Sequence, residues 1–295
     1  MKIRKYAFLT AFFSLLFLAC GQHDIVEKET TYYEFSSSSN QQAGSSSSLS
    51  SSSNQMQETS SSSVDSSVDD CDFIINLRID TECFYDETVK IPINRIPKSP
   101  IVLGSQARLK FADKASLQIM GYSLKIEPGA ELSFGEDSEL LVDAEGSLEI
   151  SGEKESMVML KADDYTKPWA GIRVRSDARS ASIEYADLSG AKTGINFGKD
   201  GVLKNSKVHN NFEYGMRQNT PFLLGNFSNN EFYSNGRDAL ISLELAATLG
   251  APEQFSGRLH ISGGGDVPAN AVLPGFAYDV EGAITVMGKL KIMPG

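Results

Sequence analysis

Apolar and polar residues alternate in short runs along most of the chain after residue 100. In LKIEPG and ELSFGEDS, Leu124 and Ile126, and then Leu132 and Phe134, stand two residues apart. Successive side chains of a β-strand point to opposite faces, so this alternation predicts strands with one buried face. Gly, Asn, Asp and Ser separate the runs and predict tight turns. We therefore expect an all-β fold of short strands.

One stretch, residues 238–249, also has the composition of a helix. Its apolar residues Ile241, Leu243 and Leu245 nevertheless alternate, which suits a strand equally well. The sequence leaves both interpretations open.

The strands repeat with a longer period. WAGIRV, TGINFG and YGMRQN share a glycine, at Gly171, Gly194 and Gly215, spaced 23 and 21 residues apart, and DALISL places Ala239 another 24 residues on. Such a period, with two or three short strands in each unit, is typical of solenoid proteins. The Leu-x-x-Leu-x-Leu frame of leucine-rich repeats is absent from the chain.

Equivalent residues of successive coils of a solenoid stack in columns. Two inner apolar columns are expected, one of Ile172, Ile195 and Met216 and one of Leu188, Val208 and Phe232. Asparagine tolerates left-handed backbone and can bond its own turn, so the following residues are expected to build turns rather than bind a ligand. They are Asn205, Asn210, Asn211, Asn229, Asn230 and Asn235.

Residues 101–245 resemble the right-handed parallel β-helix repeats of the pectate-lyase-like superfamily, in the versions found in bacterial surface lipoproteins and adhesin-like proteins. A Pro-Gly turn and a Trp-Gly strand start carry the resemblance, formed by Ile126, Pro128, Gly129, Trp169, Gly171 and Ile172. The resemblance implies a right-handed parallel β-helix. It leaves function open, because the superfamily includes polysaccharide lyases and glycosidases as well as proteins without catalysis.

Catalytic chemistry has little support in the coils from residue 169 to residue 245. Glycosidases need two carboxyl groups roughly 5–9.5 Å apart. The repeat alignment pairs Glu213 with Arg237 and Tyr214 with Asp238, and it stacks no two carboxylates beside a basic residue. The histidines lack metal-ligand spacing. We assign no catalytic residue, no metal and no cofactor.

Aromatic residues suggest a sugar-binding surface, because an exposed ring can stack on a sugar ring. We expect Phe212 and Phe232 to be core residues. The candidate sugar-stacking residues are therefore Tyr185, Tyr214 and Tyr233.

The first 19 residues have the pattern of a secretory signal. Met1–Lys5 is basic, and the apolar stretch Tyr6–Leu18 has 13 residues. A membrane-spanning helix needs about 20, so a cleaved export signal is the better interpretation.

The sequence LFLACG at the end of this signal resembles the lipobox of bacterial lipoproteins. By the resemblance, Cys20 is the lipidated first residue of the mature protein. Phe17 and Leu18 depart from the usual pattern, which leaves an ordinary secretory signal as the alternative. Gly21, where some lipoproteins have Asp, implies the outer membrane by resemblance to lipoprotein sorting rules.

Residues 20–70 have the composition of a disordered tether. Between Ser36 and Ser67, 18 of 32 residues are serine, and no apolar periodicity is present. Such a segment buries too little surface to offset the entropy of ordering. As a flexible coil it would reach roughly 40 Å.

Two cysteines remain beyond the signal, Cys71 and Cys83. An exported protein meets oxidising conditions, so we expect a disulfide between them. It would stabilise the fold by about 3 kcal/mol in the chain-entropy model. A metal site would need histidine or further cysteines nearby, and the sequence has neither there.

The chain is acidic. Its formal net charge is −11, and it falls to −14 when the signal, with its three cations and no acids, is removed. This charge argues against nucleic acid as a partner. It also argues against electrostatic docking on anionic lipid. We therefore expect the acyl anchor to attach the protein to the membrane.

The expected organisation has five parts. They are a signal peptide (1–19), a disordered tether (20–70), an N-terminal cap with a disulfide (71–104), a parallel β-helix (105–245) and a C-terminal segment (246–295). Part of that segment, 267–295, repeats 91–129 and resembles the start of a second β-helix unit. The repeat suggests truncation or pairing with a partner, with a terminal cap as the alternative.

The sequence thus favours an outer-membrane surface lipoprotein with a non-catalytic display or adhesion module. Its expected partners are the membrane, through Cys20, and a polysaccharide or another cell-surface component. The alternative is a tethered polysaccharide lyase or glycosidase.

Overall fold

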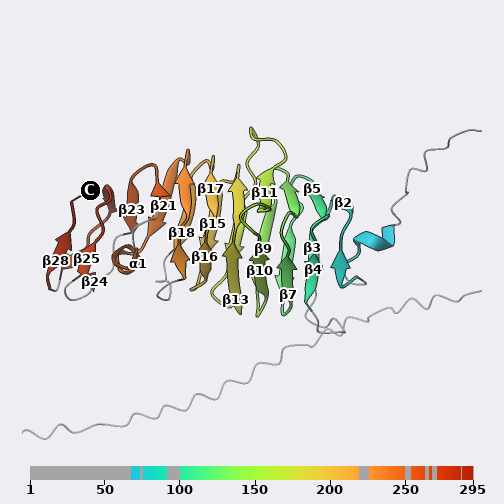
Figure 1. Ribbon diagram of the computed structural model, residues 1–295, viewed down its shortest axis with the longest axis horizontal. Helices are drawn as coiled ribbons and strands as arrows, with labels where there is room; N and C mark the ends of the chain where they lie inside the picture. Colours follow the sequence, from blue (N-terminus) through green and yellow to red (C-terminus); the bar gives the residue numbers. More distant parts are fainter. Residues whose placement is uncertain are drawn as a thin grey trace, which may run out of the picture. The chain divides into compact units, whose positions relative to one another are not determined.

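Short parallel strands are the main element in the described part of the computed structural model (Figure 1). The structure describes residues 68–73, 76–91, 100–218, 226–249, 254–262, 266–267, 271–286 and 288–294. The expected signal peptide, Cys20 and nearly all of the tether lie outside the described residues. The outcome for those predictions therefore stays open.

Three long sheets contain most of the described strands. Sheet A consists of β1 (Arg78–Ile79), β4 (Ile101–Leu103), β7 (Ser123–Ile126), β10 (Ser147–Ser151), β13 (Ser180–Glu184), β16 (Val202–Lys204) and β19 (Phe227–Ser228). Sheet B consists of β2 (Glu82–Tyr85), β5 (Arg108–Phe111), β8 (Glu131–Phe134), β11 (Val158–Ala162), β14 (Ala186–Ser189), β17 (Lys207–His209), β20 (Glu231–Tyr233) and β22 (Gln254–Phe255). Sheet C consists of β3 (Val89–Ile91), β6 (Leu117–Met120), β9 (Glu139–Asp143), β12 (Gly171–Val174), β15 (Thr193–Phe197), β18 (Tyr214–Gln218), β21 (Arg237–Ile241), β23 (Leu259–Ser262) and β26 (Tyr278–Glu281).

The order of strands shows that the chain is a β-solenoid. From β1 to β18, each strand pairs in parallel with the strand three positions further along the chain, so three consecutive strands form one coil with one strand in each sheet. We number the coils from coil 1 (β1–β3) to coil 7 (β19–β21). The prediction of an all-β, parallel solenoid is confirmed. Strands β1 to β4, within the 71–104 segment, pair into the same sheets.

Strand pairing confirms both predicted inner columns. Ile172 pairs with Ile195, and Ile195 with Met216. Leu188, Val208 and Phe232 align in the same way across sheet B.

The predicted alignment of the next coil is wrong by one residue. Tyr214 pairs with Arg237 rather than Asp238, and Met216 pairs with Ala239. Matching the glycine of the other repeats to Ala239 caused the error. A slip of one residue moves every side chain to the other face of a strand, and Ala239, which is fully buried, must take the core position.

Residues 238–249 contain both elements that the sequence left open. Strand β21 ends at Ile241, and helix α1 spans Leu243–Thr248. Ser242 caps the helix, because its side chain accepts a hydrogen bond from the backbone N of Leu245 (3.2 Å). Leu243, Leu245 and Ala246 are buried, so α1 fills the position in the chain where a sheet A strand would otherwise follow.

Two further pairs of strands follow α1. Strand β24 (Asp266–Val267) pairs with β27 (Thr285–Val286), and β25 (Ala271–Leu273) pairs with β28 (Leu290–Ile292). The described residues of the 267–295 segment thus continue the parallel pairing, both in these pairs and through β26 in sheet C.

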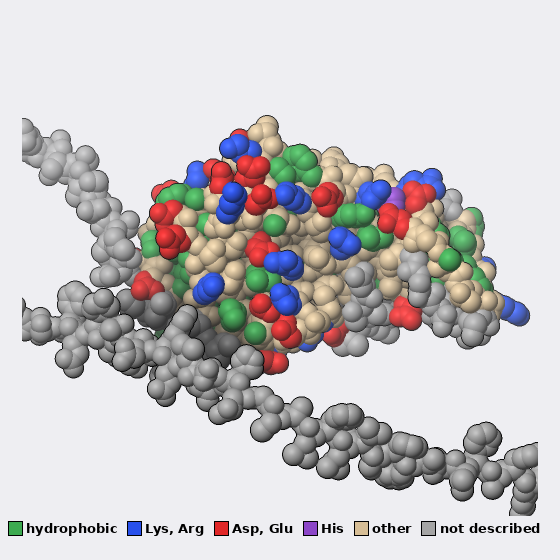
Figure 2. Space-filling view, turned by 180° about the vertical axis from the view of Figure 1, so that it is seen from behind, with side chains coloured by type: hydrophobic (Ala, Val, Ile, Leu, Met, Phe, Trp, Pro, Cys, Tyr) green, Lys and Arg blue, Asp and Glu red, His purple; other side chains and the backbone are tan. Residues whose placement is uncertain are grey.

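The outward side chains of sheet B form columns of alternating charge. Glu82, Arg108 and Glu131 stand in register on neighbouring strands, and Lys161 forms an ion pair with Glu131. On the face seen in Figure 2, acidic and basic side chains are likewise interspersed. Exposed pairs of this kind contribute up to about 1 kcal/mol each, so they fix register more than they stabilise the fold.

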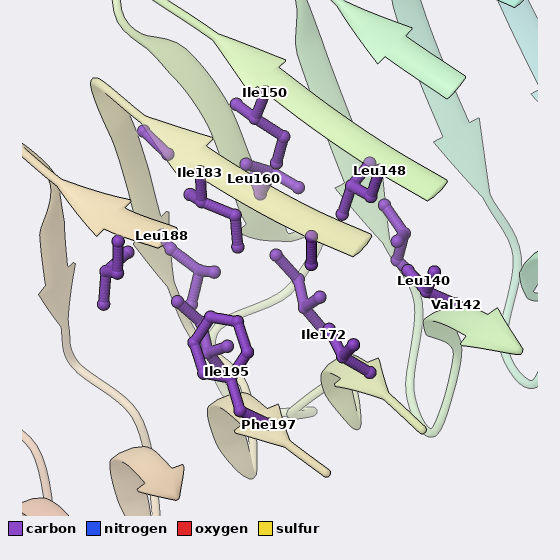
Figure 3. Close-up of a cluster of buried hydrophobic side chains, with 14 of the residues drawn as sticks. Leu140, Val142, Leu148, Ile150, Leu160, Ile172, Ile183, Leu188, Ile195 and Phe197 are labelled. Carbon is purple, nitrogen blue, oxygen red and sulfur yellow. The ribbon is translucent and has the colours of Figure 1, made fainter. Parts of the chain in front are cut away.

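The inward side chains fill the solenoid with apolar groups (Figure 3). Aromatic rings form one continuous stack through the first coils. The ring centroids are 5.5 Å apart from Phe73 to Tyr85, 5.1 Å from Tyr85 to Phe111, 5.0 Å from Phe111 to Phe134 and 4.2 Å from Phe134 to Trp169. Coil-to-coil spacing in a parallel sheet is about 4.8 Å, so rings at equivalent positions stack directly on one another.

Buried asparagines link the turns of successive coils, as the sequence predicts. Asn211 and Asn230 are almost fully buried. The Oδ1 of Asn230 accepts from the backbone N of Ser206 (3.1 Å), and its Nδ2 donates to the carbonyl of Leu203 (2.8 Å). Asn211 and Asn235 are joined through their side chains, since Nδ2 of Asn211 donates a hydrogen bond to Oδ1 of Asn235 (2.9 Å).

The predicted disulfide between Cys71 and Cys83 is present, with the two Cα atoms 5.7 Å apart. It joins a 3-10 helix, Val68–Cys71, to strand β2. Buried Phe73 lies beside this link and begins the aromatic stack. The bond therefore fastens the first described residues to the first coil.

We predict that Phe134→Ala lowers the free energy of unfolding by about 3–5 kcal/mol, because it removes a ring from the middle of the stack and leaves a cavity. Urea unfolding followed by circular dichroism measures the loss. Phe84→Ala is the control, since Phe84 is 61 % exposed on β2. Equal effects of the two substitutions would contradict a stability role for the stack.

We predict that Asn230→Ala costs roughly 1–3 kcal/mol, because it leaves a buried donor and a buried acceptor without a partner. Asn196→Ala, on the outward side of β15, should change stability by less than about 0.5 kcal/mol. Thermal unfolding of both variants tests this. A neutral Asn230→Ala would show that water replaces the lost amide.

Candidate functional site

A groove of ≈ 540 Å³ lies along the outward side of sheet A, over β7, β10 and β13. Its floor has small side chains, since Ser123, Ser147 and Ser180 stand in one register column. Larger residues border this column. Nζ of Lys125 pairs with Oε1 of Glu149 at 2.9 Å inside the groove. The groove therefore presents hydroxyl groups next to a neutralised ion pair.

Tyr185 borders this groove where the chain turns from β13 to β14. Its φ angle is +52°, in the left-handed region. In the next two coils the same position holds Asn205 and Asn229, with φ angles of +51° and +57°. Asparagine adopts this conformation readily, whereas other non-glycine residues lose roughly 1–2 kcal/mol there. A tyrosine at this position is thus an outlier in its own column.

The surroundings force this conformation on Tyr185. Its backbone N donates to the carbonyl of Lys204 in the next coil (3.1 Å), and its carbonyl accepts from the backbone N of Val158 (3.0 Å). Gly152 packs beneath it, since a Cβ on Gly152 would lie 2.1 Å from the carbonyl oxygen of Tyr185. Strained residues of this kind persist where packing fixes them, and they concentrate at functional sites.

A second hollow, of ≈ 450 Å³, lies on the other side of Tyr185. Met157, Asn205 and Lys207 line it, together with Tyr185 itself. Tyr185 is therefore shared by two hollows, one along sheet A and one where sheet A turns into sheet B. We call Tyr185 and these two hollows the corner site.

The other two candidate tyrosines lie away from the corner site. Tyr233, at the end of β20, stacks on the ring of His209 with centroids 4.6 Å apart, and Nε2 of His209 lies 2.8 Å from Oδ1 of Asp187. Burial raises the pKa of Tyr233, and the charge of Asp187 adds to the effect. One face of Tyr233 is therefore already occupied.

Tyr214 lies at the start of β18 with two guanidinium groups against its ring. The Cζ atoms of Arg217 and Arg237 are each 5.3 Å from the ring centroid, and Nη1 of Arg237 donates to the tyrosine hydroxyl (2.5 Å). The ring faces are thus engaged by the protein. The structure places Tyr214 and Tyr233 on strands of different sheets and Tyr185 in a turn, so the three tyrosines do not form one continuous stripe.

One core prediction is wrong and one is right. Phe212 is 51 % exposed, because the turn after β17 buries Asn211 and turns the next residue outward. Phe232 is 1 % exposed and belongs to the core, as expected.

The sequence analysis missed most of the sheet A groove. The coils considered for catalytic residues begin at residue 169. They therefore leave out Ser123, Lys125, Ser147 and Glu149. The signal was present, because the strand sequences SLKI, SLEIS and SASIE align in register.

The structure brings two carboxylates, Glu149 and Glu184, to the sheet A groove. Glu149 pairs with Ser182, two residues before Glu184. Strand spacing and rise then place their Cα atoms about 8 Å apart.

Within the described part of the chain, no group of three or more histidine, cysteine or acidic side chains is arranged to hold a metal ion. No helix among these residues is long and apolar enough to cross a membrane.

Comparison with protein-family models, with curated proteins and with solved structures gives no match. The function is therefore inferred from the residues and geometry of the corner site.

We predict that Tyr185→Asn raises the free energy of unfolding by roughly 1 kcal/mol, because asparagine relieves the left-handed strain. Thermal and urea unfolding measure the change. Tyr165→Asn, at an exposed tyrosine for which the structure records no positive φ, should bring no such gain. A destabilised Tyr185→Asn would show that the ring contributes more to packing than the strain costs.

Proposed function

We propose that this protein is a bacterial outer-membrane surface lipoprotein whose β-solenoid is a non-catalytic module that binds polysaccharide at the corner site. Its fold is consistent with the pectate-lyase-like resemblance of residues 101–245. The proposal includes an acyl anchor on Cys20 and the Ser-rich segment as a tether.

One observation carries the binding proposal, namely the strained Tyr185 between two hollows. The same turn is built with asparagine in the next two coils, so stability alone favours asparagine at Tyr185. The backbone bonds of Tyr185 fix the direction in which its half-buried side chain leaves the turn, and such preorganisation lowers the cost of stacking on a ligand. The hydroxyl groups of the sheet A groove match the hydrogen-bonding groups of a saccharide.

The anchor proposal is supported by the sequence of the first 21 residues and by the acidic charge. The chain has a formal net charge of −11, so an anionic lipid surface would repel it. Lipid chains would then supply the membrane affinity, and bacterial lipoproteins resembling this one carry enough of them for stable anchoring.

A second candidate function is glycoside hydrolysis in the sheet A groove. The presence of Glu149 and Glu184 in one groove favours it, since one carboxyl group could act as acid and the other as base.

The test measures binding and turnover together. Full-length protein is titrated against neutral and acidic polysaccharides, and release of reducing ends and unsaturated products is followed with and without calcium. We expect binding without turnover. Tyr185→Ala should weaken the binding about tenfold or more, as expected for an aromatic residue at the centre of an interface.

Phe84→Ala is the matched control, because it removes an exposed ring on β2, away from the corner site. Binding that survives Tyr185→Ala would overturn the site assignment. Product release that disappears in both Glu149→Gln and Glu184→Gln would replace the binding function with hydrolysis.

A further inference from the structure

We infer that the ligand of the corner site is an uncharged linear polysaccharide that binds through internal units and crosses from sheet A to sheet B, with Tyr185 beneath the middle of the bound segment. This inference rests on the proposed function and adds the direction, the binding mode and the charge class of the ligand.

The binding mode follows from the two hollows. The sheet A groove lies over β7, β10 and β13, on one side of Tyr185, and the second hollow includes Asn205 and Lys207, on the other side. A site for a chain end needs a hollow that closes behind the last unit. Here Tyr185 borders both hollows, so a polymer that lies in one hollow can continue past this residue into the other.

The direction follows from the turn. Tyr185 connects β13 in sheet A to β14 in sheet B. A ligand that occupies both hollows therefore crosses this turn. It also advances along the stack, because the groove covers β7, β10 and β13 and the second hollow reaches the next two coils through Asn205 and Glu231. Its length is limited by what fits on the two sides of one ring.

The charge class follows from the pairing of nearby groups. In the groove, Lys125 is neutralised by Glu149 at 2.9 Å. In the second hollow, Lys207 stands in register between Asp187 and Glu231. Lys154, which also lines the second hollow, lies between Glu153 and Glu155 in the sequence. The cations of the site thus have acidic neighbours, and the whole chain is negative. An acidic polymer would meet unfavourable charge at both hollows, whereas an uncharged one would not.

The hydrogen-bonding groups fit the same class. Serine hydroxyls both donate and accept, and Ser147, Ser180 and Ser182 line the groove. At the second hollow, Nδ2 of Asn229 donates to Oδ1 of Asn205 (3.2 Å), which fixes the orientation of both amides. Saccharide hydroxyls also donate and accept, so either partner can adapt.

The experiment blocks one hollow at a time. Ser182→Trp fills the groove, and Lys207→Trp fills the second hollow; both positions face outward on strands, where aromatic residues are tolerated. Ser133→Trp on β8 is the control, outward-facing and lining neither hollow. Circular dichroism and thermal unfolding confirm that each variant folds.

The probes are length series of xylan, β-glucan and mannan oligosaccharides as neutral chains, with hyaluronan and its carboxyl-reduced form as a matched acidic and neutral pair. Isothermal titration measures affinity. We expect affinity to rise with length from the disaccharide upward until both hollows are filled. Each blocking variant should lose about tenfold or more in affinity for long chains, and the control should lose none.

Three results separate the proposals. Binding that depends on Tyr185 but is unchanged by Lys207→Trp would overturn the two-sided mode. Tighter binding of hyaluronan than of its carboxyl-reduced form would overturn the uncharged class. If no polysaccharide binds in a manner that depends on Tyr185, the proposed function fails and this inference fails with it.

Discussion

Parallel stacking of one coil on the next is the constraint on which the rest of this structure depends. Each strand obtains its hydrogen bonds from the coils before and after it, so residues one period apart must occupy the same environment. This is why the rings of Tyr85, Phe111 and Phe134 stack on one another and why asparagine follows asparagine in the turns. The same constraint aligns outward side chains in columns, which is how small serines in three successive coils open a groove.

Much of this could be predicted from the sequence, because a period is visible wherever the environment repeats. The spacing of Gly171, Gly194 and Gly215 indicated the solenoid, and the inner columns of Ile172 and Leu188 followed from it. The Cys71–Cys83 bond followed from the export signal and the lack of other partners. Tyr185 is the one residue of the corner site that the sequence analysis predicted to bind a ligand.

The sequence left two interpretations open, or predicted wrongly, where the repeat changes. A helix replaces a strand at Leu243–Thr248, because local capping and helix-forming residues outweigh the alternation. The partner of Arg237 was predicted wrongly, because Ala239 resembles the glycine of the other repeats but occupies a core position. Phe212 is apolar yet exposed, because Asn211 takes the buried place beside it. The groove was missed because serine gives no periodic apolar signal.

Helix α1 has a consequence for how the molecule opens. Sheet A ends at β19 and sheet B at β22, whereas sheet C continues through β23 to β26. Sheet A thus gains no described strand after α1, and the three long sheets continue there only through β22 in sheet B and β23 and β26 in sheet C. Solenoids gain stability from nearest-neighbour contacts, and regions with fewer of them open at lower free energy. The segment beyond α1 should thus exchange its amide hydrogens as a separate cooperative unit, while Tyr185, in coil 5, keeps a complete coil on each side.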